Sequence, residues 1–271
     1  MLTRLLSIWS NILSPRAVFV LGLRQYLVYL GLVLKHSRTI IKERRMSALD
    51  QEISQHLPEV ALRFKGRYFK VNLRETDAEL QEFSKAFGSI RELFIRDCYL
   101  SDLGALPHLR VGVDLGSNRG IFSTFLASTC EQVLCVEPQP QYHDIICRNM
   151  ALNGYTHFQI ADCAIGTSKK LEGFPFPMKR LETLMAEHGL IHIDLLKIDI
   201  EGGEFDLFAD PGWLNHVSML TMELHPEAGD IDSIHRTLTA KGWRVTTRDR
   251  WLRTCAGTRD AEFLFARNPH C

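Results

Sequence analysis

An apolar run that ends in an acid and a glycine-containing turn constrains the fold of this chain more than any other feature. Residues 111–120 read Val-Gly-Val-Asp-Leu-Gly-Ser-Asn-Arg-Gly, and Glu137 follows seventeen residues later. A buried strand, a glycine turn, a helix and a second strand ending in an acid form one half of a nucleotide-binding sheet. The motif therefore predicts a parallel α/β sheet with a ligand at the carboxyl ends of its strands.

The glycine spacing indicates which ligand to expect. Dinucleotide sites place glycines close together so that backbone N–H groups can approach a pyrophosphate. Here Gly116 and Gly120 stand four residues apart and Asp114 precedes them, and a carboxylate at that position would repel phosphate. It suits a ligand with a cationic amino-acid end, such as S-adenosylmethionine (SAM). Glu137 is then expected to accept hydrogen bonds from the ribose hydroxyls.

Strand and helix patterns alternate from Leu109 onward, which predicts a mostly parallel seven-stranded, Rossmann-like sheet with helices on both faces. The last two strands, 243–247 and 262–267, are expected to pair as an antiparallel hairpin at the sheet edge. The other strands are expected near 110–115, 132–137, 156–161, 193–199 and 217–224, and the helices near 119–129, 141–152, 179–188, 203–209 and 231–241.

The residues before this sheet are expected to form two further parts. Residues 1–60 look helical and stop at Pro58, with a charged break in between. The alternation of 67–73 predicts a strand, and Thr76 with Glu79 forms a capping box for a helix over 75–87. We therefore divide the chain into an N-terminal helical extension (1–60), a strand–helix lead-in (61–108) and a SAM-binding domain (109–271).

Over roughly residues 66–245 the chain resembles the FkbM-type O-methyltransferases. The matching motifs occur in the family's order at 113–120, 135–140, 161–166, 196–204 and 222–226, and the most specific is Lys-Ile-Asp-Ile-Glu-Gly-Gly-Glu at 197–204. The resemblance implies a class I methyltransferase fold with an antiparallel C-terminal edge strand, and SAM as the methyl donor. Two departures are a short loop between Gly166 and Lys179, which leaves the acceptor open, and Ser117 in place of the usual alanine.

The motifs predict a set of cofactor-binding residues at the strand ends. Asn118 is equally compatible with a helix cap, and Asp162 could meet the adenine amino group or only form a turn. The predicted cofactor-binding residues are Asp114, Gly116, Asn118, Gly120, Glu137 and Asp162.

The acceptor side is expected where the fourth and fifth parallel strands end. Methyl transfer to a poorly nucleophilic hydroxyl needs a base, and Asp199 or His225 could supply it, with the other orienting it. Hard oxygen ligands and an imidazole could instead hold magnesium or manganese, but the spacing fits no fixed metal motif, so no metal is expected. Glu204 is explained in part by the dipole of its helix. The predicted catalytic residues are Asp199, His225, Glu201, Glu223 and Lys197.

The composition of the chain narrows the classes of binding partner to expect. Lys plus Arg equals Asp plus Glu, and no basic aromatic surface indicates nucleic acid. The seven cysteines contain no Cys-x-x-Cys pair, which is typical of reduced thiols in a cytoplasmic protein. The acceptor we expect is a hydroxyl group, of a sugar in a glycan, glycolipid or glycosylated natural product.

The segment 17–34 is apolar apart from Arg24 and Gln25, and basic residues flank it. Such a helix packs on its own domain or on a second subunit, or lies on a membrane surface. We favour packing or a homo-oligomer, then peripheral contact of residues 17–45 with the inner face of the membrane. A full span ranks last because Arg24 interrupts the run.

Two rival functions belong to other classes. A nicotinamide-dependent oxidoreductase is disfavoured because the chain lacks Gly-x-Gly-x-x-Gly at the first turn. A non-catalytic, membrane-associated adaptor that retains the fold is disfavoured by the polar residues at every strand end.

Overall fold

The computed structural model describes residues 14–43, 46–74, 86–104, 106–166 and 175–270. They belong to two compact units, the first comprising Met1–Cys98 and Ile145–Tyr155 and the second comprising Tyr99–Asp144 and Thr156–Cys271. The predicted capping box of Thr76 and Glu79 lies outside the described residues.

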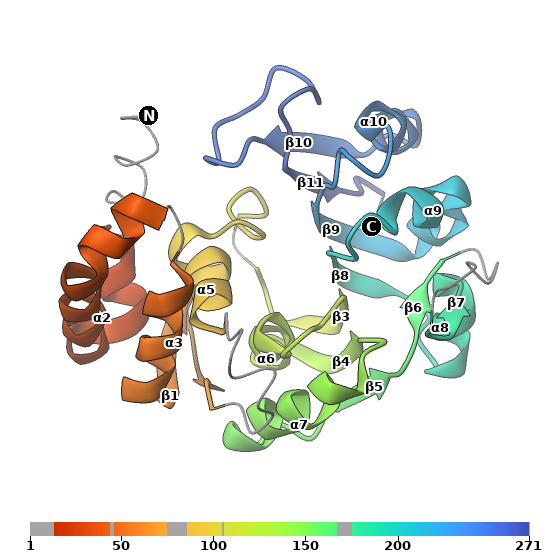
Figure 1. Ribbon diagram of the computed structural model, residues 1–271. Helices are drawn as coiled ribbons and strands as arrows, with labels where there is room; N and C mark the ends of the chain where they lie inside the picture. The colour runs from red at the N-terminus through yellow and green to blue at the C-terminus, as the bar shows by residue number, and fades with distance from the viewer. Residues whose placement is uncertain (1–13, 44–45, 75–85, 105, 167–174, 271) are drawn as a thin grey trace. The chain divides into compact units, whose positions relative to one another are not determined.

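The first unit combines helices with a hairpin. Val60 and Leu62 of one strand lie opposite Val71 and Phe69 of the other, and all four side chains are buried. The alternation of 67–73 predicts the second strand correctly, whereas the first strand was not expected. The elements are α2 (Pro15–Glu43), α3 (Ser47–His56), β1 (Glu59–Phe64), β2 (Arg67–Asn72), α5 (Ala86–Ile90) and the π-helical turn η1 (Arg91–Arg96) (Figure 1).

Helix α2 packs one face on its own unit, as the sequence predicts, with Ala17, Tyr29 and Val33 fully buried. Gln25 explains one polar interruption of the apolar run. Its side-chain amide donates to the carbonyl of Ala61 on β1 at 2.7 Å, and its carbonyl accepts the Ala61 N–H at 2.9 Å. By length and composition α2 is the one helix among the described residues that could cross a membrane, and 39% of its most apolar window is buried.

The second unit is built on a seven-stranded sheet, as predicted. Its strands are β3 (Leu109–Leu115), β4 (Cys130–Val136), β5 (Phe158–Ala161), β8 (Ile193–Ile198), β9 (Val217–Glu223), β10 (Arg244–Arg248) and β11 (Phe263–Arg267), in the order β10-β11-β9-β8-β3-β4-β5. Neighbours from β9 to β5 are parallel, and β11 is antiparallel to both β9 and β10. The C-terminal hairpin thus forms the sheet edge, with its reversed strand β11 one position inside β10. A separate pair joins β6 (Ala164–Ile165) to β7 (Met178–Lys179).

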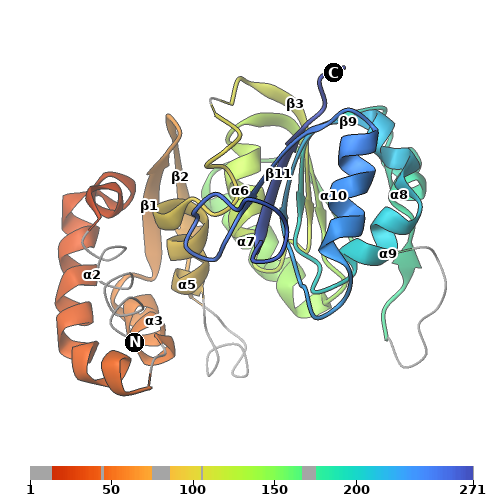
Figure 2. The same cartoon turned by 90° about the horizontal axis from the view of Figure 1, so that it is seen from above.

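Helices cover both faces of this sheet. Figure 2 shows α6 on one side of the strands and α8, α9 and α10 on the other. The helices of this unit are α6 (Ile121–Ala127), α8 (Leu181–Glu187), α9 (Glu204–Ala209) and α10 (Ile231–Ala240), with the 3₁₀ turns η2 (Pro140–Tyr142) and η3 (Pro211–His216). The fifth helix after β3, α7 (His143–Leu152), belongs to the first unit from Ile145 onward. All five helices lie within a few residues of their predicted ranges.

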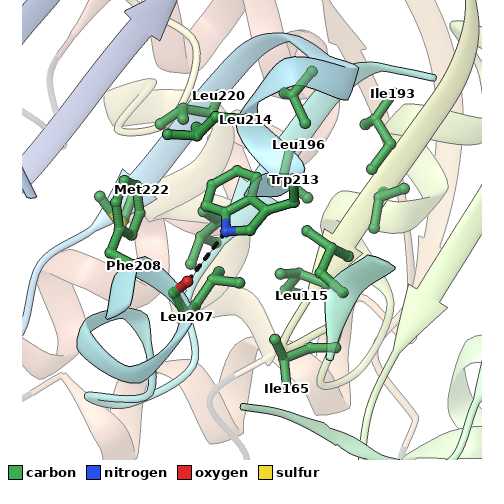
Figure 3. Close-up of a cluster of buried hydrophobic side chains, with 14 of the residues drawn as sticks. Leu115, Ile165, Ile193, Leu196, Leu207, Phe208, Trp213, Leu214, Leu220 and Met222 are labelled. Carbon is green, nitrogen blue, oxygen red and sulfur yellow. Dashed lines mark hydrogen bonds between the residues drawn. The ribbon is translucent and has the colours of Figure 1, made fainter. Parts of the chain in front are cut away.

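Trp213 of η3 anchors the core on the side of α8, α9 and α10 (Figure 3). Its side chain is fully buried, and its indole N–H donates to the carbonyl of Leu207 at 3.1 Å. Its ring meets the ring of Phe208 edge to face, with the centroids 5.2 Å apart. This packing fixes η3 and α9 against β8 and β9, the two strands that carry the acidic residues described next.

Candidate active site

The parallel register brings the ends of the strands to one line. Leu115 of β3 pairs with Val136 of β4 and Ile198 of β8, Val136 pairs with Ala161 of β5, and Ile198 pairs with Met222 of β9. The next residue on each strand is therefore at the same edge of the sheet. Those residues are Gly116, Glu137, Asp162, Asp199 and Glu223.

The turn after β3 requires glycine. Gly116 has a φ of 75°, and a Cβ at this position would lie 1.8 Å from the carbonyl oxygen of Asp199. The N–H groups of Gly116 and Ser117 both donate to the carbonyl of Val136 at 3.0 Å. Gly120, with a φ of 66°, is the N-cap residue directly before α6. The absence of a side chain thus allows the turn to touch the loop after β8.

Asn118 is not the cap of α6, because Gly120 holds that position. Its own φ is 48°, in the left-handed region. Its N–H donates to Oε2 of Glu137 at 2.8 Å, and its side-chain oxygen accepts the N–H of Arg119 at 2.9 Å. Asn118 therefore links the glycine turn to the end of β4.

The carboxylate of Glu137 is buried and held in one orientation. Besides Asn118, the N–H of Gln139 donates to its other oxygen, Oε1, at 2.9 Å. Burial raises the pKa of Glu137, and the two backbone hydrogen bonds oppose that rise. A carboxylate can accept about four hydrogen bonds, so acceptor capacity remains on both oxygens. Asp162, directly after β5, is exposed.

Lys197 forms the centre of a buried ion-pair network. Its Nζ lies 3.1 Å from Oδ1 of Asp114 and 3.4 Å from Oδ2 of Asp199, and it donates to the carbonyl of Gly116 at 2.8 Å. Burial lowers the pKa of Lys197, but the two carboxylates outweigh it and the net pKa is raised, so the ammonium persists. Pairing of Lys197 with Asp199 confirms the shared strand face expected from the sequence.

The side chain of Asp114 is buried inside the unit, although its position before the glycine turn suggested that it would face the ligand. Its side chain is fully buried, and its second oxygen, Oδ2, accepts the hydroxyl of Ser123 at 2.6 Å. The carboxylate thus faces Lys197 and α6 rather than solvent, because the β3 pleat points it into the unit. Its contact with a cofactor stays a prediction.

Tyr99 contacts both Asp199 and Glu223, two of the acids that were expected on the acceptor side. Nothing in the sequence around Tyr99 indicates this contact. Its hydroxyl lies 3.0 Å from Oδ2 of Asp199 and 2.5 Å from Oε2 of Glu223. The Tyr99 hydroxyl thus holds the carboxylates of Asp199 and Glu223 close together around one oxygen atom.

His225 is held by Glu204, an acid that the sequence explained in part by the dipole of its helix. Its Nδ1 lies 2.7 Å from Oε1 of Glu204, a fully buried carboxylate, and that oxygen also accepts the N–H of His225 at 3.1 Å. The hydrogen bond to Glu204 raises the pKa of His225 to about 9, in spite of partial burial. The ring is consequently an imidazolium at neutral pH, which donates hydrogen bonds and cannot accept a proton.

Three of the groups could hold a divalent ion. One ligand atom from each of Asp199, Glu201 and His225 falls within 4.8 Å of the others. Glu201 has a φ of 53° and an exposed side chain. The structure thus gathers the predicted acceptor-side residues around Asp199, and it places Glu137, Asn118 and Gly116 on the glycine side.

Comparison with known proteins gives concordant matches. A model of the methyltransferase FkbM domain matches residues 114–245. Methyltransferase sdnD of Sordaria araneosa is 26% identical over 216 residues, which cover 59% of this chain and 82% of that protein. Methyltransferase 1 of Beauveria bassiana is 26% identical over 208 residues, with coverage of 59% and 82%.

Solved structures resemble the chain more distantly. Methyltransferase FkbM from Methylobacillus flagellatus superposes with a TM-score of 0.48 and 15% identity, covering 71% of this chain and 56% of that one. An rRNA methylase from Streptococcus thermophilus gives a TM-score of 0.41 and 12% identity, covering 59% and 87%.

Proposed function

Residues 114–245 make this chain a member of the FkbM methyltransferase family, and we propose that it transfers a methyl group from SAM to a hydroxyl oxygen of a sugar. The acceptor is a glycan, a glycolipid or a glycosylated natural product, and the reaction takes place in the cytoplasm. The observation that carries the proposal is the line of strand-end residues along one sheet edge, in which the glycine turn at Gly116 lies between Glu137 on one side and Asp199 and Glu223 on the other.

The glycine side fits SAM. The turn at Gly116 has a positive φ and packs directly against the carbonyl of Asp199, which fixes the backbone at the end of β3. Glu137 is fixed by two backbone N–H groups and keeps free acceptor capacity for ribose hydroxyls. Asp162 is exposed at the end of the neighbouring strand β5, and we propose that it accepts a hydrogen bond from the adenine amino group. When bound, SAM supplies an electrophilic methyl group on a sulfonium.

The acceptor side supplies the base and the orientation. We assign the base to Asp199, since the imidazolium of His225 already carries its proton. Tyr99 and Lys197 hold the Asp199 carboxylate from two directions. An alcohol is a weak nucleophile, so the carboxylate takes its proton as the oxygen attacks. Glu223, bonded to the same Tyr99 hydroxyl, provides a second acceptor for a proton or for a neighbouring sugar hydroxyl.

His225 and Glu201 are proposed to orient the acceptor. The protonated ring offers its Nε2–H toward the space beside Asp199, and Glu201 lies 3.5 Å from that nitrogen. A polyhydroxyl acceptor presents both donors and acceptors, so a mixed set of carboxylates and one imidazolium suits it.

Calorimetry tests the cofactor half of this proposal. Glu137→Ala should weaken SAM binding by at least about tenfold, because it removes the carboxylate that accepts hydrogen bonds from the two ribose hydroxyls. Glu131→Ala is the matched control, since Glu131 is an exposed acid at the opposite end of the same strand. Equal SAM affinity in the wild-type and Glu137→Ala proteins would remove the ribose role, and binding of NAD in place of SAM would revive the oxidoreductase alternative.

Mass-spectrometric detection of methylated sugars tests the catalytic half. Asp199→Asn should reduce turnover by about 10²–10⁴-fold while SAM affinity stays unchanged. Glu227→Gln, an exposed acid beyond β9, serves as the control. Full activity of Asp199→Asn would refute the assigned base, and SAM binding without methyl transfer to any hydroxyl acceptor would favour the adaptor alternative.

A further inference from the structure

The outward face of α2 gathers most of the exposed apolar bulk in the described chain. Of eight exposed large hydrophobic side chains, five lie on this helix, with exposed fractions between 48% and 65%. They are Phe19, Leu23, Leu27, Leu34 and Ile41. Gly22 has non-helical backbone angles (φ 68°, ψ 158°) that kink α2, and Phe19 lies before this kink. After the kink, Leu23, Leu27, Leu34 and Ile41 follow one another at spacings of four, seven and seven residues, which keeps these four side chains within about 40° of one another around the helix axis.

Basic side chains border this apolar face. Arg24, Lys35, Arg38 and Lys42 are all exposed and follow the apolar positions along one side. Of these, Lys35 also pairs with Glu52 of α3 at 2.6 Å. Residues 1–42 contain six Lys or Arg and no Asp or Glu, although the whole chain has no net charge. The charge of the chain is therefore strongly asymmetric, with its positive end on and before α2.

We propose that the outward face of α2 binds the surface of an anionic membrane, with the helix axis in the plane of the interface. Large apolar side chains flanked by Lys and Arg are the composition of interfacial helices, whose basic side chains reach lipid phosphates while the apolar ones enter the acyl boundary. This inference stands independently of the proposed methyl transfer.

Two other occupants fit the helix less well. A membrane span would have to expose the buried face, and it would break the pair of hydrogen bonds between Gln25 and Ala61 of β1. A symmetric contact with a second copy of the chain would bring a second set of these basic side chains to the same interface. The helix carries no acid before Glu43 that could neutralise them. Anionic lipid supplies the missing negative charge.

Vesicle flotation of the full chain tests the proposal. The wild-type protein should float with vesicles of equal parts phosphatidylcholine and phosphatidylglycerol, and not with phosphatidylcholine alone. Leu27→Ser with Leu34→Ser should weaken binding by at least about tenfold. Arg24→Gln with Arg38→Gln should weaken it less and remove most of its salt dependence. Both positions in each pair are exposed, so folding should be retained, which circular dichroism checks.

Ile191→Ser is the matched control, because Ile191 is the most exposed large apolar side chain among the described residues and lies outside α2. It should bind vesicles like the wild type. Equal binding by the Leu27→Ser, Leu34→Ser protein would overturn the proposal. The proposal would also be overturned if the wild-type protein did not bind vesicles and instead formed a dimer that Leu27→Ser with Leu34→Ser converts to a monomer. Extraction of the wild-type protein from membranes by detergent alone would overturn it as well, because that result indicates a membrane span.

Discussion

Protonation of His225 gives the site a pH dependence that can be measured. The ring has an ordinary pKa of 6.5, which the hydrogen bond to buried Glu204 raises to about 9 in the folded protein. A raised folded-state pKa means that the folded protein binds the proton more tightly than the unfolded chain does. The stabilisation is fully present below about pH 6.5 and is lost as the pH rises through about 9.

The magnitude follows from that pKa difference. At about 1.36 kcal/mol per pKa unit, the rise corresponds to about 3 kcal/mol of stability at acidic pH. The ring is only 13% exposed, so solvent screens the pair weakly, and we expect about 2–3 kcal/mol to be measurable. That is a large share of the free energy of unfolding of a typical domain.

Denaturant unfolding of the wild-type and His225→Gln proteins measures this contribution. The stability difference between them should shrink by about 2–3 kcal/mol between about pH 6 and about pH 10, while His216→Gln, at an exposed position, should show no such trend. An NMR titration of the His225 ring reports the pKa directly, and Glu204→Gln should lower it. A wild-type pKa close to 6.5, or a stability difference that does not change with pH, would refute the reasoning.

Three further outcomes are expected. Gly116→Ala should destabilise the protein by about 2–5 kcal/mol in denaturant unfolding, because the new Cβ would collide with the backbone of Asp199. Gly154 also has a positive φ but has open space around it, so Gly154→Ala should cost only the backbone strain, about 1–2 kcal/mol. Lys197→Met should destabilise by about 3–5 kcal/mol, because Asp114 remains buried without its cation, and the loss should diminish on acidification. EDTA dialysis should leave turnover unchanged because protonated His225 is a poor metal ligand; a loss that magnesium restores would assign the cluster to a metal.

The sheet could be predicted because its parallel strands are buried on both faces, so each appears as a continuous apolar run between turn residues. Strand β1 was harder to detect, although Val60, Leu62 and Phe64 alternate with exposed or half-buried residues. Lys65 and Gly66 both have positive φ, which is typical of a tight hairpin turn. A Lys-Gly pair between two alternating runs is the signal that identifies this hairpin.

The site was only partly predictable, because several of its contacts join residues far apart in sequence. Alternation places Glu223 and His225 near Asp199, but Tyr99 reaches those acids from about a hundred residues away. Likewise, acids in a first helical turn are common for reasons of the helix dipole, so the sequence does not reveal that Glu204 is fully buried against His225. That contact changes His225 from a candidate base to a cation.

The position of β11 has a consequence for how the protein is made. β10 precedes β11 in the chain but joins the sheet only through it, since β11 lies between β10 and β9. During synthesis the strands from β3 to β9 can assemble in turn, whereas β10 has no partner until residues 263–267 have left the ribosome. A nascent chain stalled before that point, or one clipped in the loop after β10, would expose the β9 edge, an open template for aggregation.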